Sequence, residues 1–598
     1  MLKGNNDSKL VDMHVPEICV PFYQVWQELV DRRTLDVYQY RVLTSLSGLK
    51  ELESVIVKTL SGLFNSDANI EACREEMLYS LDRDAILDRH YKPILNRLRA
   101  SLGEKPKVIA DKNRLLHQIR YATKEIESTY LKFALSDLKS SILTKNIRKI
   151  EDYANTVASQ AIYNGWSPQG LFDLLRFFRQ EKNFDEQWET FSKILLDSTT
   201  VEHQVLINVP FRGKSTAEQE KTLFALNQLD LNVKTYEQIT ACFATITDIG
   251  HLIKSEKRYF LIEVKAKDIY AAAHAAITKI SEKLNLASFY NLVNAWDLKS
   301  VVIVTINTQN NYHRSFTAEA LYETHDYIDS SSRVFDSTRQ IFIDKDKQAI
   351  RDKLQGSFGY TNISRASLFQ EEKYMNLWVA LESLARTDMQ SNIISNVRET
   401  VPAATSLRYI YRIVRNFVED CRRCGILFAF STQTIDMEQE SKQKMVKETI
   451  AMLQDSTLFS ELQEKCKVNT LLSYRANDIL KLISEIPFAK NKIENHYKRV
   501  NWQIQRLYRI RNEIAHAALQ EHASLLMYIE HLYDYLSTYI SEIVNYLVEK
   551  EYSTIEDALC AIKGNYDVFI AFYNSSDKSL IKEEVLRTGI IDLISFSE

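Results

Sequence analysis

Glycine and proline are scarce in this sequence of 598 residues, which contains 13 glycines and 8 prolines. These are about 2% and 1% of the chain, against average usage of about 7% and 5%. Collagen-like, mucin-like and many-turned β-sandwich proteins need these residues at frequent intervals, so the composition excludes all three classes. Because glycine and proline are the residues that interrupt helices, long helices must dominate. The sequence predicts a mostly α protein.

Cysteine and long apolar runs are also rare. The 7 cysteines are an odd number without the spacing of a disulfide framework, which is typical of reduced thiols in a cytoplasmic protein. No stretch of 18 apolar residues occurs and the polar start resembles no secretory signal, so we expect no membrane segment. The net charge of -4 gives no general attraction to nucleic acid. Any binding of RNA must therefore come from a local patch.

The length is three to four times the usual domain length of about 150 residues, so we expect a multi-domain chain. Helical periodicity gives way to short β-branched runs near residue 200 and returns near residue 365. The strands are expected at 205–209, 259–264 and 301–306, with an alanine-rich helix at about 268–285. The predicted parts are an α-helical domain at 1–199, a small α/β domain at 200–350, a helical bundle at 360–550 and a helical tail at 551–598.

Two motifs that resemble cofactor or metal sites are incomplete. Gly213-Lys214-Ser215 follows a strand, as a phosphate-binding loop does, but Asn208 stands where that loop needs its first glycine. Cys421 and Cys424 form a CxxC pair without a second pair to complete four zinc ligands. We therefore predict no cofactor and no metal ion.

A third pattern leaves an alternative open. Glu263-Val264-Lys265 on a strand, with Asp248 upstream, has the carboxylates and lysine of a metal-dependent nuclease. Alternating Glu and Lys on a half-exposed strand is the commoner origin of this tripeptide. A metal-dependent nuclease that uses Glu263 and Lys265 is thus the least favoured function.

The segment that follows Pro487 is the most informative. It runs for about 28 residues without glycine or proline, which predicts one long helix over about 490–518. Between 488 and 511 one acidic residue, Glu494, accompanies seven basic ones: Lys490, Lys492, Lys498, Arg499, Arg506, Arg509 and Arg511. A local charge of +6 attracts polyanions, although a solvated charged face is the usual origin of such a run. Lys498, Arg499, Arg506 and Arg509 are the predicted RNA-binding residues.

Arg511 occupies an apolar position of this helix. The apolar stripe consists of Val500, Ile504, Leu507, Ile514 and Ala518, and Arg511 fills its missing step. A guanidinium at such a position needs an anion, either a carboxylate in the core or a phosphate of a ligand. Asn512 and His516 lie four residues apart on the adjoining face, where the amide can orient the imidazole. Arginine stabilises charge on a phosphoryl group and histidine transfers protons near neutral pH, which suffices for RNA cleavage through the 2'-hydroxyl.

Arg511-Asn512-Glu513-Ile514-Ala515-His516 resembles the RNxxxH motif of the HEPN superfamily of ribonucleases. The segment 372–385, which contains Trp378, Ala380, Leu381 and Glu382, resembles the first helix of the abortive-infection, ApeA-like HEPN branch. The resemblance covers about 365–550. It implies a helical-bundle endoribonuclease, usually a homodimer, that acts in antiviral defence against phage or as a toxin. Because Glu382 and Arg511 are far apart in sequence, extra helices are expected at about 430–475.

Glu382 also lies on an apolar stripe of its own helix, so its carboxylate needs a cation. Arg511 and His516 are the expected partners if the two helices are neighbours. Either Glu382 orients the catalytic pair, or it forms an ordinary salt bridge of the core.

Helix geometry favours a dimer. Five residues at 100° each place His516 about 140° around the helix from Arg511, so two copies related by a two-fold axis would build a composite site more easily than one. The leading hypothesis is a metal-independent RNA endonuclease with catalytic residues Arg511, Asn512, His516 and Glu382. The region before it would respond to a phage-derived trigger and gate the site. The alternative is a non-catalytic HEPN scaffold that binds RNA or a partner protein.

Overall fold

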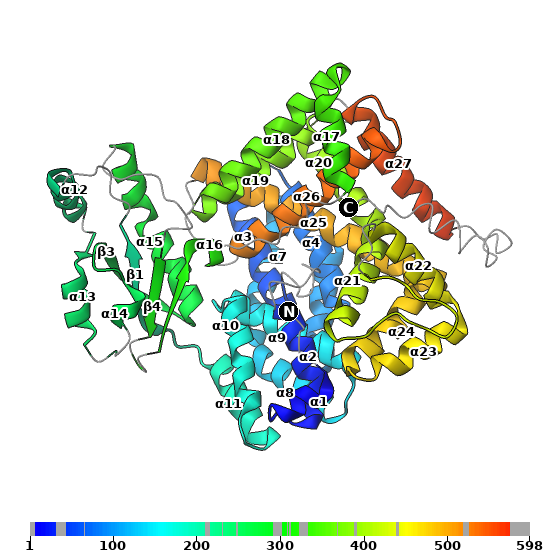
Figure 1. Ribbon diagram of the computed structural model, residues 1–598, viewed down its shortest axis with the longest axis horizontal. Coiled ribbons are helices and arrows are strands. Elements are labelled where there is room, and N and C mark those ends of the chain that lie inside the picture. Colours follow the sequence, from blue (N-terminus) through cyan, green and yellow to red (C-terminus); the bar gives the residue numbers. More distant parts are fainter. Residues whose placement is uncertain are drawn as a thin grey trace.

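The computed structural model describes residues 6–574 with gaps. The gaps are at 31–42, 65, 210–215, 230, 245, 247–248, 291–301, 308, 310–311, 322–332, 368, 388–391, 438–441 and 518–524. The described part of the chain is mostly helical and contains one small sheet (Figure 1). The prediction of a mostly α chain is confirmed.

The N-terminal helices share one core. They are α1 (Asp7–Asp12), α2 (Val20–Val30), α3 (Ser45–Leu60), α4 (Ala68–Leu81), α5 (Ala85–His90), α6 (Lys92–Gly103), α7 (Ile109–Glu127), α8 (Tyr130–Leu143), α9 (Ile147–Tyr163), α10 (Pro168–Asp173) and α11 (Phe184–Leu196). Rings from α2 and α11 meet at its centre, where Phe22 and Trp26 lie 5.8 and 5.2 Å from Phe191. The indole N–H of Trp26 donates to the carbonyl of Leu171 at 3.0 Å, so α2 also fixes α10.

An antiparallel sheet follows, in the strand order β2-β3-β1-β4-β5. Its elements are β1 (Val201–Asn208), α12 (Thr216–Gln228), β2 (Val233–Lys234), α13 (Tyr236–Cys242), α14 (Ile249–Leu252), β3 (Tyr259–Ala266), α15 (Ile269–Phe289), β4 (Val302–Asn307), β5 (His313–Thr317) and α16 (Ala318–Leu321). The small alanines of α15 pack on one face of the sheet, and α13 and α14 cover the other. The three predicted strands and the alanine-rich helix are present. β2 and β5 were not predicted, because neither has a buried apolar run.

The C-terminal helices share the largest core, which extends from Val334 to Phe569. They are α17 (Arg333–Ile343), α18 (Gln348–Ala366), α19 (Gln370–Ala385), α20 (Ile393–Leu407), α21 (Tyr409–Arg423), α22 (Lys442–Gln454), α23 (Ser456–Cys466), α24 (Thr470–Ser484), α25 (Ile486–Ala517), α26 (Leu525–Val548) and α27 (Ile555–Asn574). This core is wider than the predicted bundle at 360–550. Leu354 of α18 and Leu559 of α27 are fully buried in it, so neither helix is a linker or a separate tail. The extra helices expected at about 430–475 include α22 and α23.

Polar contacts around Asp268 join the N-terminal helices to the sheet domain. Ser167 caps α10, as its position before Pro168 predicts, and its hydroxyl also donates to Asp268 at 2.7 Å. The carboxylate of Asp268 in turn accepts the N–H groups of Tyr270 and Ala271 at the start of α15, each at 2.9 Å. One buried carboxylate therefore caps a helix of the sheet domain and holds the N-terminal helices against it.

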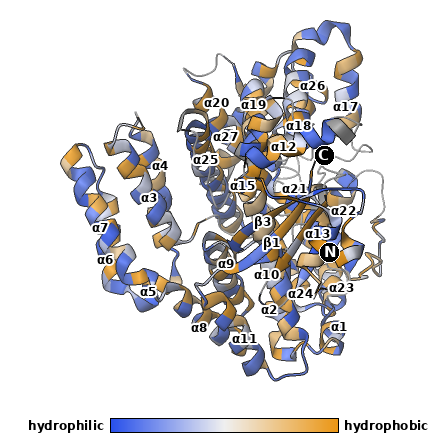
Figure 2. Cartoon of the chain, turned by 90° about the vertical axis from the view of Figure 1, so that its left-hand side faces the viewer, coloured by the Kyte–Doolittle hydropathy of each residue, from blue (hydrophilic) through white to orange (hydrophobic). Residues whose placement is uncertain are grey.

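The helices α3–α7 form an arm that stands apart from α8–α11 in Figure 2. The tip of this arm is not isolated, because α3 and α4 contact α25 of the C-terminal bundle. Within the described residues, no helix is long and apolar enough to cross a membrane.

Gly170 of α10 is expected to be irreplaceable at the joint with Asp268. A Cβ atom on Gly170 would lie 2.3 Å from Oδ2 of Asp268, whose carboxylate is held by four hydrogen bonds. We expect Gly170→Ala to lower the free energy of unfolding by about 1–3 kcal/mol, as overpacking does. Urea unfolding followed by tryptophan fluorescence measures this. Gly356→Ala in α18 is the control: it meets open space and should stabilise the chain by about 0.5–1 kcal/mol. Equal shifts of the two midpoints would contradict the role of Gly170.

Candidate functional site

Helix α25 carries the predicted site and is one continuous helix of 32 residues, as the sequence predicts. It is aligned along α19 by two contacts on successive turns. The Tyr374 hydroxyl donates to the carbonyl of Leu507 at 2.5 Å, and the rings of Trp378 and Tyr508 lie 5.8 Å apart. Tyr374, Trp378 and Glu382 are four residues apart and share a face of α19. The next contact along this face is made by Glu382.

Glu382 lies beside Arg511. The guanidinium Nη2 is 3.8 Å from Oε2 of Glu382, and the two side chains are 26% and 19% exposed. The prediction that these two residues are neighbours is confirmed. At 3.8 Å the pair is within range of charge attraction but too long for a hydrogen bond. Arg511 is therefore oriented by Glu382 without being fully occupied by it.

Two further observations describe the surroundings of Arg511. Its Nη1 donates to Oδ1 of Asn512 at 3.1 Å, and its buried Nε has no hydrogen-bond partner among the described residues. An unpaired donor on a charged group is costly, and an anionic oxygen would satisfy it. The side chain of His516 lies outside the described part of the structure, so its position relative to Asn512 and Arg511 stays a prediction.

Arg506 and Arg509 do not form the exposed RNA-binding surface that the sequence predicts. They are 2% and 4% exposed and face the carboxylates of α3 and α4. Arg506 Nε donates to Glu51 at 2.8 Å, its Nη2 contacts Glu76, and Arg509 Nη2 also contacts Glu51. In this structure both guanidinium groups neutralise protein carboxylates and are not available to RNA phosphates. The basic run did not predict that Arg506 and Arg509 are buried, because the carboxylates that pair with them lie more than 400 residues away in sequence.

Neutral contacts surround this ion cluster. Gln505 donates to Asn69 at 2.9 Å, Trp502 packs on Tyr79 with ring centroids 5.3 Å apart, and the Sγ of Cys73 accepts from Arg509 at 3.2 Å. Burial acts to lower the pKa of Arg506, but the charges of Glu51 and Glu76 outweigh it and raise that pKa above its ordinary value. The neighbouring carboxylates also raise the pKa of Arg509, so both guanidinium groups stay charged, whereas burial raises the pKa of the Glu76 carboxyl above its ordinary value.

Lys58 of α3 extends the contact up to the motif itself. Its ammonium lies 2.7 Å from Oε1 of Glu513, which is 4% exposed and stands between Asn512 and Ile514. The N-terminal arm thus holds the same turn of α25 that presents Arg511 to α19. Sequence reasoning missed Glu51, Glu76 and Lys58. The excess of six positive charges between residues 488 and 511 was the one available signal that carboxylates must come from elsewhere.

Lys498 and Arg499 are exposed. At 100° per residue, Arg499 lies about 120° and Lys498 about 140° around the helix from Arg511, in opposite directions. Neither shares the face of Arg511, so their contact with RNA stays a prediction.

The remaining motifs occupy ordinary structural positions where the structure describes them. Cys421 is buried in α21 and Cys424 caps its end, where burial raises the pKa of the Cys424 thiol to about 12. Glu263 accepts a hydrogen bond from Gln204 of the neighbouring strand at 3.2 Å. Asp248 and the segment Gly213-Lys214-Ser215 lie outside the described residues, so the metal-nuclease alternative is not tested. In the described part of the chain no group of three or more His, Cys, Asp or Glu side chains could hold a metal ion.

Comparisons of the chain with protein-family models, curated proteins and solved structures give no match. The candidate site is therefore interpreted from its own geometry.

We expect Glu51→Gln to destabilise the contact between the arm and α25. Removing one charge from a buried ion cluster leaves guanidinium groups uncompensated and costs about 3–5 kcal/mol. Glu53→Gln is the matched control on the same helix, because Glu53 pairs with Arg120 where that arginine is 49% exposed. Such a pair contributes about 0–1 kcal/mol. Hydrogen exchange of α3, α4 and α25 measures the difference. Equal exchange in the two variants would show that the cluster does not hold the arm.

Proposed function

We propose that this protein is a metal-independent RNA endonuclease of the HEPN type, with its site on α19 and α25. The observation that supports the proposal best is the state of Arg511. Its guanidinium is partly exposed, 3.8 Å from the orienting carboxylate of Glu382, and keeps an unpaired Nε donor. This contrasts with the buried Arg506, which contacts Glu51 and Glu76, and the buried Arg509, which contacts Glu51 and the Sγ of Cys73. A guanidinium with unused donors suits a phosphate that arrives with a substrate.

The proposed reaction uses the 2'-hydroxyl of RNA as nucleophile. His516 accepts its proton while the oxygen attacks the adjacent phosphate, and Arg511 stabilises the charge that develops on the phosphoryl oxygens. The bond to the 5'-oxygen breaks, and that oxygen takes up a proton. The products carry 2',3'-cyclic phosphate and 5'-hydroxyl ends. Asn512, which accepts a hydrogen bond from Arg511, positions the guanidinium together with Glu382.

The proposal includes a homodimer. Within one copy, Arg511 faces Glu382 of α19, while His516 is five residues further along the same helix. A second copy related by a two-fold axis brings the His516 of one chain toward the Arg511 of the other. The composite cleft would then contain Arg511, Asn512 and His516 of both chains.

The proposal also includes control by the N-terminal arm. Glu51 and Glu76 of the arm form ion pairs with α25, and Lys58 of the arm contacts Glu513 within the motif. A trigger, which we propose to be phage-derived, would act by weakening these ion pairs between the arm and α25. The Glu51→Gln chain should then cleave RNA without a trigger faster than the Glu53→Gln chain. Such a nuclease would act as an abortive-infection effector or toxin.

Loss of either proposed catalytic side chain should abolish most RNA cleavage by the full chain. We expect His516→Ala to lower the rate by about 10²–10⁴, the usual contribution of a general acid–base. Arg511→Ala should lower it by about 10²–10³, as loss of a charge-stabilising donor does. Cleavage of a labelled RNA in EDTA measures both, and end-group analysis identifies the cyclic phosphate.

His117→Ala and Arg114→Ala on α7 are the controls, because both residues are exposed and distant in sequence from the site. Both should cleave at the wild-type rate. Full loss of wild-type activity in EDTA, restored by Mg²⁺ or Mn²⁺, would instead favour a metal-dependent nuclease that uses Glu263 and Lys265. RNA binding without cleavage, unchanged in His516→Ala, would favour the non-catalytic scaffold.

The composite site predicts complementation between inactive chains. In a mixed dimer of Arg511→Ala and His516→Ala chains, one of the two sites keeps both intact residues. Random mixing makes half of the dimers mixed, so we expect about a quarter of the wild-type activity to return. RNA cleavage is measured on the mixture, and light scattering measures whether the chains form dimers. A protein that is monomeric at the working concentration and fully active would rule out the shared site.

A further inference from the structure

The strand β3 has an open edge. The two residues of β2 pair only with its first part, where the Leu261 N–H also donates to the carbonyl of Asn232 at 2.9 Å. Backbone groups alternate along a strand, so the N–H and C=O groups of Glu263 and Lys265 point the same way as those of Leu261, away from β1. The carbonyl of Glu263 accepts from Lys279 Nζ at 2.8 Å, which agrees with this direction. Among the described residues, no backbone group pairs with the outward N–H groups of Glu263 and Lys265.

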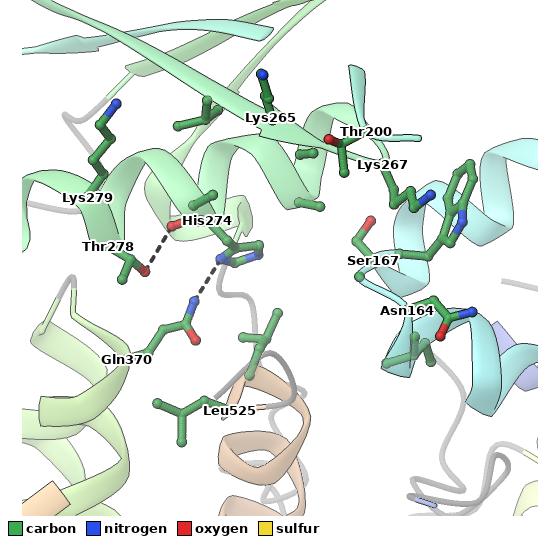
Figure 3. A pocket seen from close by; sticks show the side chains of 18 of the residues that line it. Asn164, Ser167, Thr200, Lys265, Lys267, His274, Thr278, Lys279, Gln370 and Leu525 are labelled. Carbon is green, nitrogen blue, oxygen red and sulfur yellow. Dashed lines mark hydrogen bonds between the residues drawn. The ribbon is translucent and has the colours of Figure 1, made fainter. Parts of the chain in front are cut away.

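A cavity of about 1000 Å³ is lined by Glu263 to Lys267, at the end of β3 that β2 does not cover. It lies where the three parts of the protein meet. Figure 3 shows its walls: His274 and Thr278 of α15, Gln370 and Leu525 of the C-terminal helices, and Asn164 and Ser167 of the N-terminal helices. The amide of Gln370 lies 3.2 Å from Nδ1 of His274 and bridges two of these walls. The volume is at the upper end of the range for ligand pockets.

The side chains around the edge differ on its two faces. On the α15 face the small residues Ala271 and Ala275, with Leu526 of α26, leave apolar space. On the opposite face Glu263 and Lys265 are exposed and stand beside Gln204 and Glu202 of β1. A ligand that follows the edge thus meets an apolar wall, two opposite charges and backbone donors that no described backbone group pairs with.

From this arrangement we infer that the cavity binds an extended polypeptide segment of a partner protein, which adds as a strand to the β3 edge. Strand addition satisfies outward backbone groups and places alternate side chains on opposite faces. The expected segment carries an acidic side chain beside Lys265 and a basic one beside Glu263, because opposite charges on neighbouring strands attract. The residue between them is apolar and faces Ala275. The segment would displace the Lys279 ammonium from the Glu263 carbonyl.

The inference does not depend on the proposed nuclease activity, but it would add a route of control to it. The cavity is walled by the first turns of α19 and α26. Glu382 lies on α19, and α26 follows Arg511 in the chain. A bound segment would therefore touch both helices that flank the candidate site.

The test selects displayed linear peptides of about eight residues, a length typical of strand addition, on the full chain. Enriched peptides are synthesised, and their Kd is measured for the wild-type chain and for the Lys265→Pro and Lys265→Thr variants. Lys265→Pro removes the outward N–H without breaking a bond to β1, because proline is tolerated where an edge N–H faces outward. Lys265→Thr removes the same ammonium and keeps the N–H. We expect Lys265→Pro to bind at least about tenfold more weakly than Lys265→Thr, the effect of losing one well-made hydrogen bond and its neighbours.

Hydrogen exchange locates the peptide independently of the substitutions. On the wild-type chain, the peptide should protect the amides of 262–267. If Lys265→Pro disturbs the sheet, Ala275→Phe replaces it, since it fills the cavity from α15 and should also prevent binding. Equal binding to Lys265→Pro and Lys265→Thr by folded chains, protection elsewhere only, or no enrichment over the Ala275→Phe chain would overturn the inference. So would protection of 262–267 by RNA in the absence of any binding peptide.

Discussion

Two buried guanidinium groups hold the arm α3–α7 against the C-terminal helices. Arg506 and Arg509 lie on the side of α25 that faces away from the C-terminal core, and neither can stay buried without an anion. Glu51 and Glu76 provide the negative charges from helices at the other end of the chain. The arm α3–α7 is consequently attached at its tip to the helix that carries the RNxxxH-like motif. Any movement of the arm must separate this cluster or carry α25 with it.

The arginines of α25 show how one helix gives the same side chain different tasks. Arg506 and Arg509 are buried and paired with the carboxylates of the arm, which makes them structural. Arg511, two residues after Arg509, is held at a longer distance by one carboxylate, and its Nε has no partner among the described residues. The difference arises from the neighbours: α3 and α4 cover the first two, whereas α19 offers Glu382 alone. Tyr374 and Trp378 set this spacing by fixing α19 along α25.

The sheet domain connects the other two parts through polar contacts at its rim. Asp268 links α15 to the N-terminal helices through Ser167, and His274 links the same helix to α19 through Gln370. Both contacts flank the cavity along β3. A ligand in this cavity would lie between two joints that already hold the three parts together. A ligand bound in this cavity is therefore well placed to take part in the proposed control of the site.

The sequence by itself determined most of the secondary structure and the need of Glu382 for a cationic partner. Helical periodicity, the scarcity of glycine and proline, and Pro487 are local signals, and they predicted α25 and most strands correctly. A charged residue on an apolar stripe needs a counter-charge, so Arg511 and His516 were the expected partners of Glu382, and the structure brings Arg511 beside it. Only the tertiary structure decided which other basic residues are exposed. Arg506 and Arg509 are separated from Glu51 by more than 450 residues, and no spacing encodes such a contact. The ends of the C-terminal core and the open edge of β3 were equally beyond local patterns, because both depend on what packs beside a helix or a strand.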